Sequence, residues 1–141
     1  MTIAVDTNIL IDILEPDPVF GESSKEALKY CLQQDHVVAC DIVWAEIATA
    51  YQADIEGLLV LLEQMGIGFS PLSQASALAA ARIWYGYRKK GGTRQRIAAD
   101  FLIGAHAFMQ CDRLLSRDSG FFRNYFSDVR LVIPTSVKLP D

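Results

Sequence analysis

The sequence predicts an α/β protein in which a parallel sheet is covered by helices on both faces. Short apolar runs alternate with longer amphipathic segments along the chain, and this alternation is typical of strand–helix–strand units. Apolar residues make up 51% of the 141 residues, enough for one core in a single domain over residues 1–141. Right-handed crossovers would bring the carboxyl ends of all strands to the same edge of the sheet.

The first strand–helix unit shows how the elements are recognised. Residues 2–6 contain an apolar run that predicts a strand. Thr7 and Asn8 are both acceptable helix caps and predict that a helix follows at once. Pro16 and Pro18 end that helix, because proline cannot continue its hydrogen bonding.

The remaining elements follow from the same kinds of signal. Ser23–Glu26 resembles a capping box, Asp41 is read as the cap of a further helix, and Ser73 opens an Ala-rich one. Paired glycines predict a loop at 89–93. The expected strands are residues 2–6, 36–40, 66–71, 113–116 and 131–133, and the expected helices are residues 7–14, 23–34, 41–51, 54–65, 73–88, 97–111 and 120–125.

Charge is distributed unevenly along the chain, although the net charge is only −4. Residues 1–81 hold two Lys or Arg against twelve acids, a balance of 2 − 12 = −10, whereas residues 82–141 hold eleven against five, a balance of 11 − 5 = +6. Six of the cations lie between Arg82 and Arg96. They form either a local basic patch or the solvated faces of helices.

The cysteines and the apolar runs bear on the compartment. Cys31, Cys40 and Cys111 are odd in number and form no CxxC pair, so neither a disulfide framework nor a zinc site is indicated. Every apolar stretch is shorter than the roughly 20 residues that span a bilayer, and the N-terminus lacks the pattern of a signal peptide. We therefore expect a protein of the reducing cytoplasm without a membrane anchor.

Four acidic residues stand where carboxylates are unusual. Asp6 ends the first apolar run, and Asp118 follows the strand-like Leu114–Leu115 segment. Asp100 and Glu46 each interrupt an otherwise apolar helix among small neighbours. Because the tips of parallel strands meet at one crevice, we expect these acids to converge there.

Convergence of these carboxylates predicts a divalent cation. Two carboxylates about 5 Å apart repel by roughly 3 kcal/mol at an effective dielectric of 20. Oxygen ligands without nearby Cys or His favour Mg²⁺ or Mn²⁺ over Zn²⁺. Such an ion activates water and clamps a phosphodiester.

Each acid also has a structural interpretation. Asp6 would merely cap the following helix, Asp100 would pair with Arg96, Glu46 would be an exposed helix residue and Asp118 a turn residue. The functional interpretation therefore depends on their joint placement.

The motifs together resemble the PIN-domain family, in particular the VapC-type ribonuclease toxins of toxin–antitoxin pairs. The resemblance covers nearly the whole chain. The segments that match the family, in its order and spacing, are Ile3–Leu10, Trp44–Ile47, Asp100–Ala107 and Leu114–Asp118 followed by Phe121 and Phe122.

The resemblance implies a three-layer α/β sandwich with a five-stranded parallel sheet and a Mg²⁺- or Mn²⁺-dependent endoribonuclease. It implies that Asp6 and Asp100 are the central metal ligands, that Glu46 and Asp118 complete the catalytic site, and that Ser116 and Asn8 orient it. It also implies a homodimer and a small antitoxin partner that blocks the crevice.

Cations and aromatic residues flank the paired glycines before the Asp100 segment. We expect five of them to contact RNA phosphates: Arg88, Lys89, Lys90, Arg94 and Arg96. Arg117 and Arg123 would extend this surface. A solubilising loop, or a contact with an acidic antitoxin tail, is the alternative. Trp84, Tyr85 and Tyr87 would stack on bases, or serve as core or dimer contacts.

Other side chains are assigned structural roles. His106 lies six residues past Asp100 and is expected on the surface or in a dimer contact. Asp12 is expected to be solvated or paired.

The sequence thus predicts a metal-dependent endoribonuclease that acts as a toxin. A phosphatase of the haloacid-dehalogenase type is a rival, but Asn8 stands where that pattern requires a second aspartate. A non-catalytic module that binds RNA or protein is the other alternative.

Overall fold

The computed structural model describes residues 1–51, 54–91 and 98–134, and within them it contains the predicted parallel sheet. Its strands are β1 (Thr2–Val5), β2 (His36–Ala39), β3 (Ile67–Phe69), β4 (Arg113–Leu115) and β5 (Arg130–Val132). They run in the order β3-β2-β1-β4-β5, and every neighbouring pair is parallel. The five-stranded parallel sheet is therefore confirmed, with β1 at its centre.

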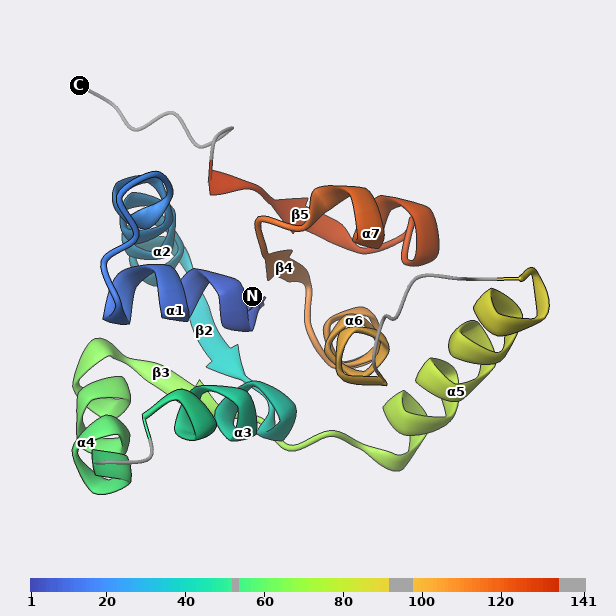
Figure 1. Ribbon diagram of the computed structural model, residues 1–141, viewed down its shortest axis with the longest axis horizontal. Helices are drawn as coiled ribbons and strands as arrows, with labels where there is room; N and C mark the ends of the chain where they lie inside the picture. Colours follow the sequence, from blue (N-terminus) through green and yellow to red (C-terminus); the bar gives the residue numbers. More distant parts are fainter. Residues whose placement is uncertain (52–53, 92–97, 135–141) are drawn as a thin grey trace.

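Helices occupy the connections between these strands and cover the sheet on both faces. They are α1 (Thr7–Leu14), α2 (Gly21–Gln34), α3 (Asp41–Ala50), α4 (Ile55–Met65), α5 (Gln74–Lys89), α6 (Ala98–Gln110) and α7 (Ser119–Tyr125). Figure 1 shows α1 and α2 on one side of the strands and α5 and α6 on the other. The crossover from β3 to β4 runs back across the sheet, and a right-handed crossover in that direction lies on the opposite face.

The central strand explains why the site lies where it does. Ile3, Ala4 and Val5 are each at most 2% exposed, because helices cover both faces of β1. A strand buried on both faces is a continuous apolar run rather than an alternating one. The first polar side chain after it, Asp6, is therefore delivered to the carboxyl edge of the sheet.

The predicted helix ends differ from the structure at several caps. The first helix is capped by Asp6, whose side chain accepts a hydrogen bond from Thr7 N, rather than by Thr7 or Asn8. The capping box predicted at Ser23–Glu26 is wrong, because α2 begins at Gly21 and Ser24 is buried inside it. Before α2, the Asp17 carboxylate accepts hydrogen bonds from the backbone N of Val19 and from the backbone N of Phe20.

Two further boundaries shift for local reasons. The cap of α3 is Cys40, and Asp41 is the first helical residue, where its carboxylate accepts from Leu72 N at 3.3 Å. Helix α5 includes Lys89, which the paired glycines predict to be in a loop; the chain turns at Gly91, which has a φ of 74°. The cap predicted at Ser73 is confirmed, and the helix predicted to end at residue 65 does end there, followed by Gly66, which has the left-handed φ of 86° that glycine tolerates.

An aromatic cluster joins the helices on the α5–α6 face. Phe101 on α6 contacts Trp84, Tyr87, Phe121 and Tyr125 with ring centroids 5.2–6.2 Å apart. These contacts fix α5 and α7 against the helix that carries Asp100. Rings in tilted and edge-on arrangements add stabilisation beyond the area that they bury.

His106 is not on the surface, contrary to the sequence-based expectation. Its side chain is 1% exposed, and its Nε2 lies 2.9 Å from the Ser70 hydroxyl. Gln110, one turn further on, accepts from Ser73 N and Ser76 Oγ and donates to the carbonyl of Pro71. This end of α6 therefore holds the segment that leads from β3 into α5. In the described ranges no helix is long and apolar enough to span a membrane.

Candidate active site

Asp6 is the centre of the site. It follows β1 directly, and its backbone N donates to the carbonyl of Leu115 at the end of β4. One carboxylate oxygen, Oδ1, caps α1 by accepting from Thr7 N at 2.8 Å. The other, Oδ2, accepts from Ser116 Oγ at 2.6 Å and from Asn8 Nδ2 at 3.3 Å. The cap is thus present, and it uses only one of the two oxygens.

The environment of Asp6 is costly for a negative charge. The side chain is 6% exposed, and burial raises its pKa from 3.8 to about 6. Hydrogen bonds from Ser116 and Thr7 lower the pKa in part, whereas the charges of Asp100 and Glu46 raise it further. Asp100 on α6 and Glu46 on α3 are therefore both close enough to influence Asp6 at the end of β1.

Glu46 is positioned by a residue that the sequence suggests only as a helix cap. Thr7 donates its hydroxyl to Glu46 Oε1 at 2.7 Å, while its backbone N donates to Asp6. Thr7 is 8% exposed and Glu46 is half-buried. A single residue in the first turn of α1 thereby links two carboxylates that are 40 positions apart. The sequence signal that could have identified Thr7 is its position directly after Asp6.

Ser116 and Asn8 surround the same carboxylate. Ser116 is fully buried, donates to Asp6 and accepts from the backbone N of Asp118 at 3.0 Å. Asn8 Nδ2 lies 3.5 Å from Ser116 Oγ, and its Oδ1 accepts from Arg117 N at 3.3 Å. The structure thus brings Ser116 and Asn8 against Asp6. The half-buried Asp118 is joined to them through its backbone N, which donates to Ser116 Oγ.

Arg117 does not extend the predicted RNA surface as a free cation. Its Nε and Nη2 donate to the two carboxylate oxygens of Asp12 at 2.6 and 3.0 Å. Its guanidinium carbon also lies 4.0 Å from the centre of the Phe20 ring. Asp12 is 3% exposed and accepts from Ser24 Oγ as well. This buried pair ties α1 and α2 to the segment that holds Ser116 and Asp118, and the sequence did not single it out as a pair.

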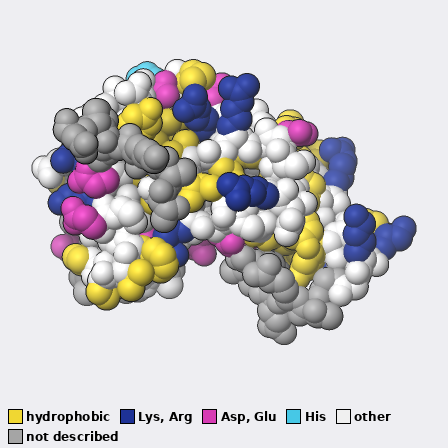
Figure 2. Space-filling model, turned by 90° about the horizontal axis from the view of Figure 1, so that it is seen from above, with side chains coloured by type: hydrophobic (Ala, Val, Ile, Leu, Met, Phe, Trp, Pro, Cys, Tyr) yellow, Lys and Arg dark blue, Asp and Glu magenta, His cyan; other side chains and the backbone are white. Residues whose placement is uncertain are grey.

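The predicted basic residues divide between described and undescribed parts of the chain. Arg88 and Lys89 are exposed on the last turn of α5, and the exposed Lys90 follows them. Arg94 and Arg96 lie outside the described residues, and so does the alternative ion pair between Asp100 and Arg96. Figure 2 shows Lys and Arg side chains at the right of the view, the end of the molecule that Figure 1 assigns to α5.

The donor chemistry of the acids fits Mg²⁺ or Mn²⁺ better than a softer metal, because the charged groups that influence Asp6 are the carboxylates of Asp100 and Glu46. Within the described ranges no three His, Cys, Asp or Glu side chains are placed to ligate a single ion together. Mg²⁺ usually keeps several waters and uses only one or two carboxylates, so Asp6 with one neighbour is sufficient. The raised pKa of Asp6 is the structural sign of a charge that a cation would stabilise.

The fold and the site define a parallel α/β protein with carboxylates at the switch point of its sheet. The PIN domain model matches residues 3–127, and the chain therefore belongs to the PIN domain family. No curated protein matches the sequence.

Solved structures with the same fold are distant in sequence. VapBC2 of Rickettsia felis, bound to a DNA fragment from its promoter, is 17% identical with a TM-score of 0.75, covering 94% of this chain and 98% of that chain. VapBC-1 of nontypeable Haemophilus influenzae is 21% identical with a TM-score of 0.74, covering 96% and 100%. FitAcB of Neisseria gonorrhoeae is 24% identical with a TM-score of 0.70, covering 96% and 99%.

Proposed function

We propose that this protein is a Mg²⁺- or Mn²⁺-dependent endoribonuclease and the toxin of a cytoplasmic toxin–antitoxin pair. The observation that carries the proposal is the buried Asp6 carboxylate, which ends β1 and faces the charges of Glu46 and Asp100. The PIN fold and its likeness to VapBC and FitAB structures support the assignment.

The residues would divide the work as follows. Asp6 and Asp100 would hold the ion, and the ion, when bound, would activate water and neutralise phosphate charge. Thr7 keeps the Glu46 carboxylate directed at the site, where it accepts a proton from water. Ser116 and Asn8 fix the orientation of Asp6. Asp118 contributes a further carboxylate from the same edge.

Partner binding is part of the proposal. Structures similar to this chain are complexes of a toxin with an antitoxin, such as the toxin–antitoxin complex from Klebsiella pneumoniae. We propose a small antitoxin that blocks the crevice, and a homodimer of the free toxin. Co-expression with the open reading frame adjacent to this one, followed by co-purification and light scattering, tests both. A monomer that retains no partner would contradict both.

The decisive test is cleavage of defined single-stranded RNAs by wild-type protein and by matched carboxylate variants. Asp6→Asn and Glu46→Gln should lower the rate by orders of magnitude. Glu56→Gln, an exposed residue on α4, should not change it. EDTA should abolish cleavage and added Mn²⁺ should restore it. Equal rates for wild-type protein and the Asp6→Asn variant would contradict the proposal.

Thr7 offers a finer test of the same site. Thr7→Val keeps the shape of the side chain but removes the hydrogen bond to Glu46, whereas Thr7→Ser keeps a hydroxyl. We expect Thr7→Val to lower kcat at least about tenfold, which corresponds to about 1.4 kcal/mol, and Thr7→Ser to restore most of it. Equal kcat values for the two variants would show that this hydrogen bond does not position Glu46.

A non-catalytic module that binds RNA or protein is the second candidate. The observation that favours it is the absence, among the described residues, of three side chains gathered for one ion. Calorimetry with Mn²⁺ separates the two, because an enzyme of the proposed kind takes up the ion through Asp6 and a binding module does not.

A further inference from the structure

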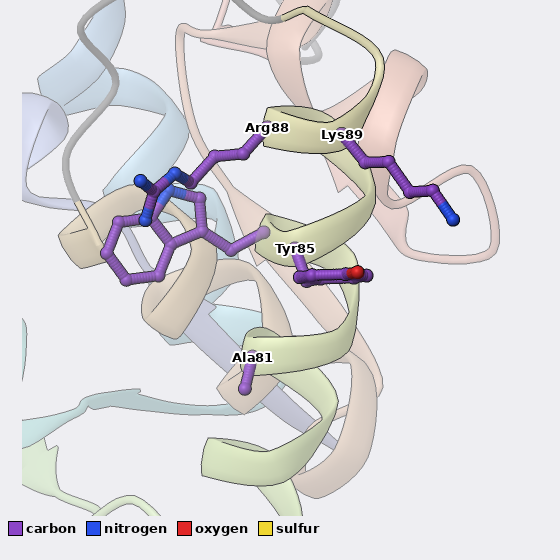
Figure 3. Close-up of a pocket in the computed structure, with 5 residues that line it drawn as sticks. Ala81, Tyr85, Arg88 and Lys89 are labelled. Carbon is purple, nitrogen blue, oxygen red and sulfur yellow. The ribbon is translucent and has the colours of Figure 1, made fainter.

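A hollow on the outer face of α5 is lined by aromatic and basic side chains, and the packing of the fold does not explain why they are there. It has a volume of about 530 Å³ and is lined by Ala81, Trp84, Tyr85, Arg88 and Lys89. Figure 3 shows Ala81, Tyr85 and Lys89 along one face of the helix, with Arg88 and Lys89 extending to opposite sides of Tyr85. The small side chain of Ala81 leaves one side of the Tyr85 ring open.

The aromatic side chains of the hollow differ in their role. Tyr85 is 68% exposed, so little protein covers its ring. Trp84 is half-buried and stacks on Phe101 with ring centroids 6.2 Å apart and planes inclined by 25°. The Arg88 guanidinium lies 5.8 Å from the centre of the Trp84 ring. Trp84 therefore anchors the hollow, and Tyr85 presents a free aromatic surface beside two cations.

The charged side chains of α5 itself have one sign only. Helix α5 reads QASALAAARIWYGYRK and contains no acidic residue, and Lys90 follows it. Paired charges on a helix surface would suit solubility alone, whereas cations without acids attract a polyanion. The combination of an exposed ring with adjacent cations is the one used to bind single-stranded nucleic acid.

The hollow also lies near the candidate active site. Phe101, on which Trp84 stacks, is the residue after Asp100 in the first turn of α6. The line of contacts from Arg88 through Trp84 to Phe101 thus ends beside a proposed metal ligand.

We propose that this hollow is a subsite for one unpaired nucleotide of the RNA, with the base stacked on Tyr85 and the flanking phosphates held by Arg88 and Lys89. The inference rests on the proposed function, since it assumes an RNA substrate. An unpaired base is required, because bases inside a duplex present no free face to a side chain. The unbalanced positive charge favours RNA over a second protein as the occupant.

The test measures RNA affinity separately from cleavage. A fluorescein-labelled single-stranded RNA of mixed sequence and about ten nucleotides is titrated with Asp6→Asn protein, so that the RNA stays intact, and anisotropy is recorded. Adding Tyr85→Ala should weaken binding about fivefold to 150-fold, the range measured for loss of one base stack. Tyr85→Phe should retain the affinity, because it keeps the ring.

Arg88 supplies a second, electrostatic readout. Arg88→Ala should reduce the slope of log affinity against log salt by about 0.7, the value for one phosphate contact on a single strand. Phe108→Ala and Lys29→Ala are the matched controls: Phe108 is an exposed aromatic on α6 and Lys29 an exposed cation on α2. Both should leave the affinity and the slope unchanged.

The outcomes separate this subsite from the enzymatic proposal. Weaker binding by Tyr85→Ala supports the subsite even if wild-type protein cleaves no RNA, in which case only the nuclease assignment fails. Unchanged affinity in Tyr85→Ala overturns the subsite even if wild-type protein cleaves RNA. A change of molecular mass by light scattering with unchanged RNA affinity would assign the face to a protein contact and also overturn it.

Discussion

Replacing Asp6 with asparagine should make the metal-free protein more stable while it removes activity. The substitution preserves the shape of the side chain and removes its charge. Asp6 is 6% exposed, and its pKa is raised to about 6, chiefly by burial and further by Asp100 and Glu46. The charged form is therefore disfavoured in the folded protein.

The magnitude follows from the two pKa values of Asp6. In the unfolded chain the carboxyl titrates near 3.8 and in the folded protein near 6. A difference of about two pH units corresponds to about 3 kcal/mol. Between these values the folded state binds more protons than the unfolded state, so stability falls as pH rises from 4 to 6 and stays lower above 6. An asparagine at this position does not titrate, so the Asp6→Asn variant lacks this dependence, and its gain in stability should reach about 3 kcal/mol at pH 7.5.

The assay is urea unfolding in EDTA, followed by circular dichroism, at pH 7.5 and pH 4.5. The Asp6→Asn variant should exceed wild-type protein by about 2–3 kcal/mol at pH 7.5, and the difference should be much smaller at pH 4.5. Asp128→Asn, which alters an exposed carboxylate, is the control and should change little. An Asp6→Asn variant that is less stable than wild-type protein at pH 7.5 would refute the reasoning.

Three further substitutions test the packing and the ion pairs around the site. Arg117→Ala leaves the buried Asp12 carboxylate without its cation and should cost about 3 kcal/mol in urea unfolding, whereas Arg123→Ala, at an exposed position on α7, should cost less than about 0.5 kcal/mol. Gly104→Ala would place a methyl group 2.5 Å from the Phe126 ring and should cost about 1–3 kcal/mol; Gly86→Ala, with nothing within 4 Å, should be neutral or stabilise by up to about 1 kcal/mol. Burial lowers the pKa of His106 below 6.5, so as pH falls below 6.5 the unfolded state binds more protons than the folded state and stability falls. The His106→Gln variant should lose this part of the pH dependence of the urea midpoint. An identical pH profile for the variant and wild-type protein would contradict this prediction.

Much of the fold was predictable because the signals are local. The run Ile3–Val5 is apolar throughout and predicted a buried strand, which the structure confirms as β1. Gly66 and Ser73 mark helix ends through their own backbone and side-chain chemistry. The cap at Ser23–Glu26 failed because α2 begins earlier, at Gly21, so Ser23 lies within the first turn and donates its hydroxyl to the carbonyl of Phe20.

The sequence predicted that Glu46 and Asp100 lie near Asp6, but it did not predict the hydrogen bonds that connect this region. Asp6 was expected at the carboxyl edge because it follows the central strand, and Glu46 and Asp100 were expected near it because each interrupts an otherwise apolar helix. The hydrogen bond from Thr7 to Glu46 and the pair between Arg117 and Asp12 depend on how helices pack. Such distances are not encoded in any short segment. His106 was expected on the surface or in a dimer contact because of its offset from Asp100 along the helix, whereas its burial depends on the contact with Ser70 in the connection after β3.

The most direct test of the central claim is an anomalous difference map from a crystal soaked in MnCl₂. The account predicts a peak at about 2.0–2.2 Å from carboxylate oxygens of Asp6 and Asp100, with Glu46 within reach directly or through a water. A fully soaked crystal that shows manganese only at exposed carboxylates elsewhere, and none beside Asp6, would contradict it.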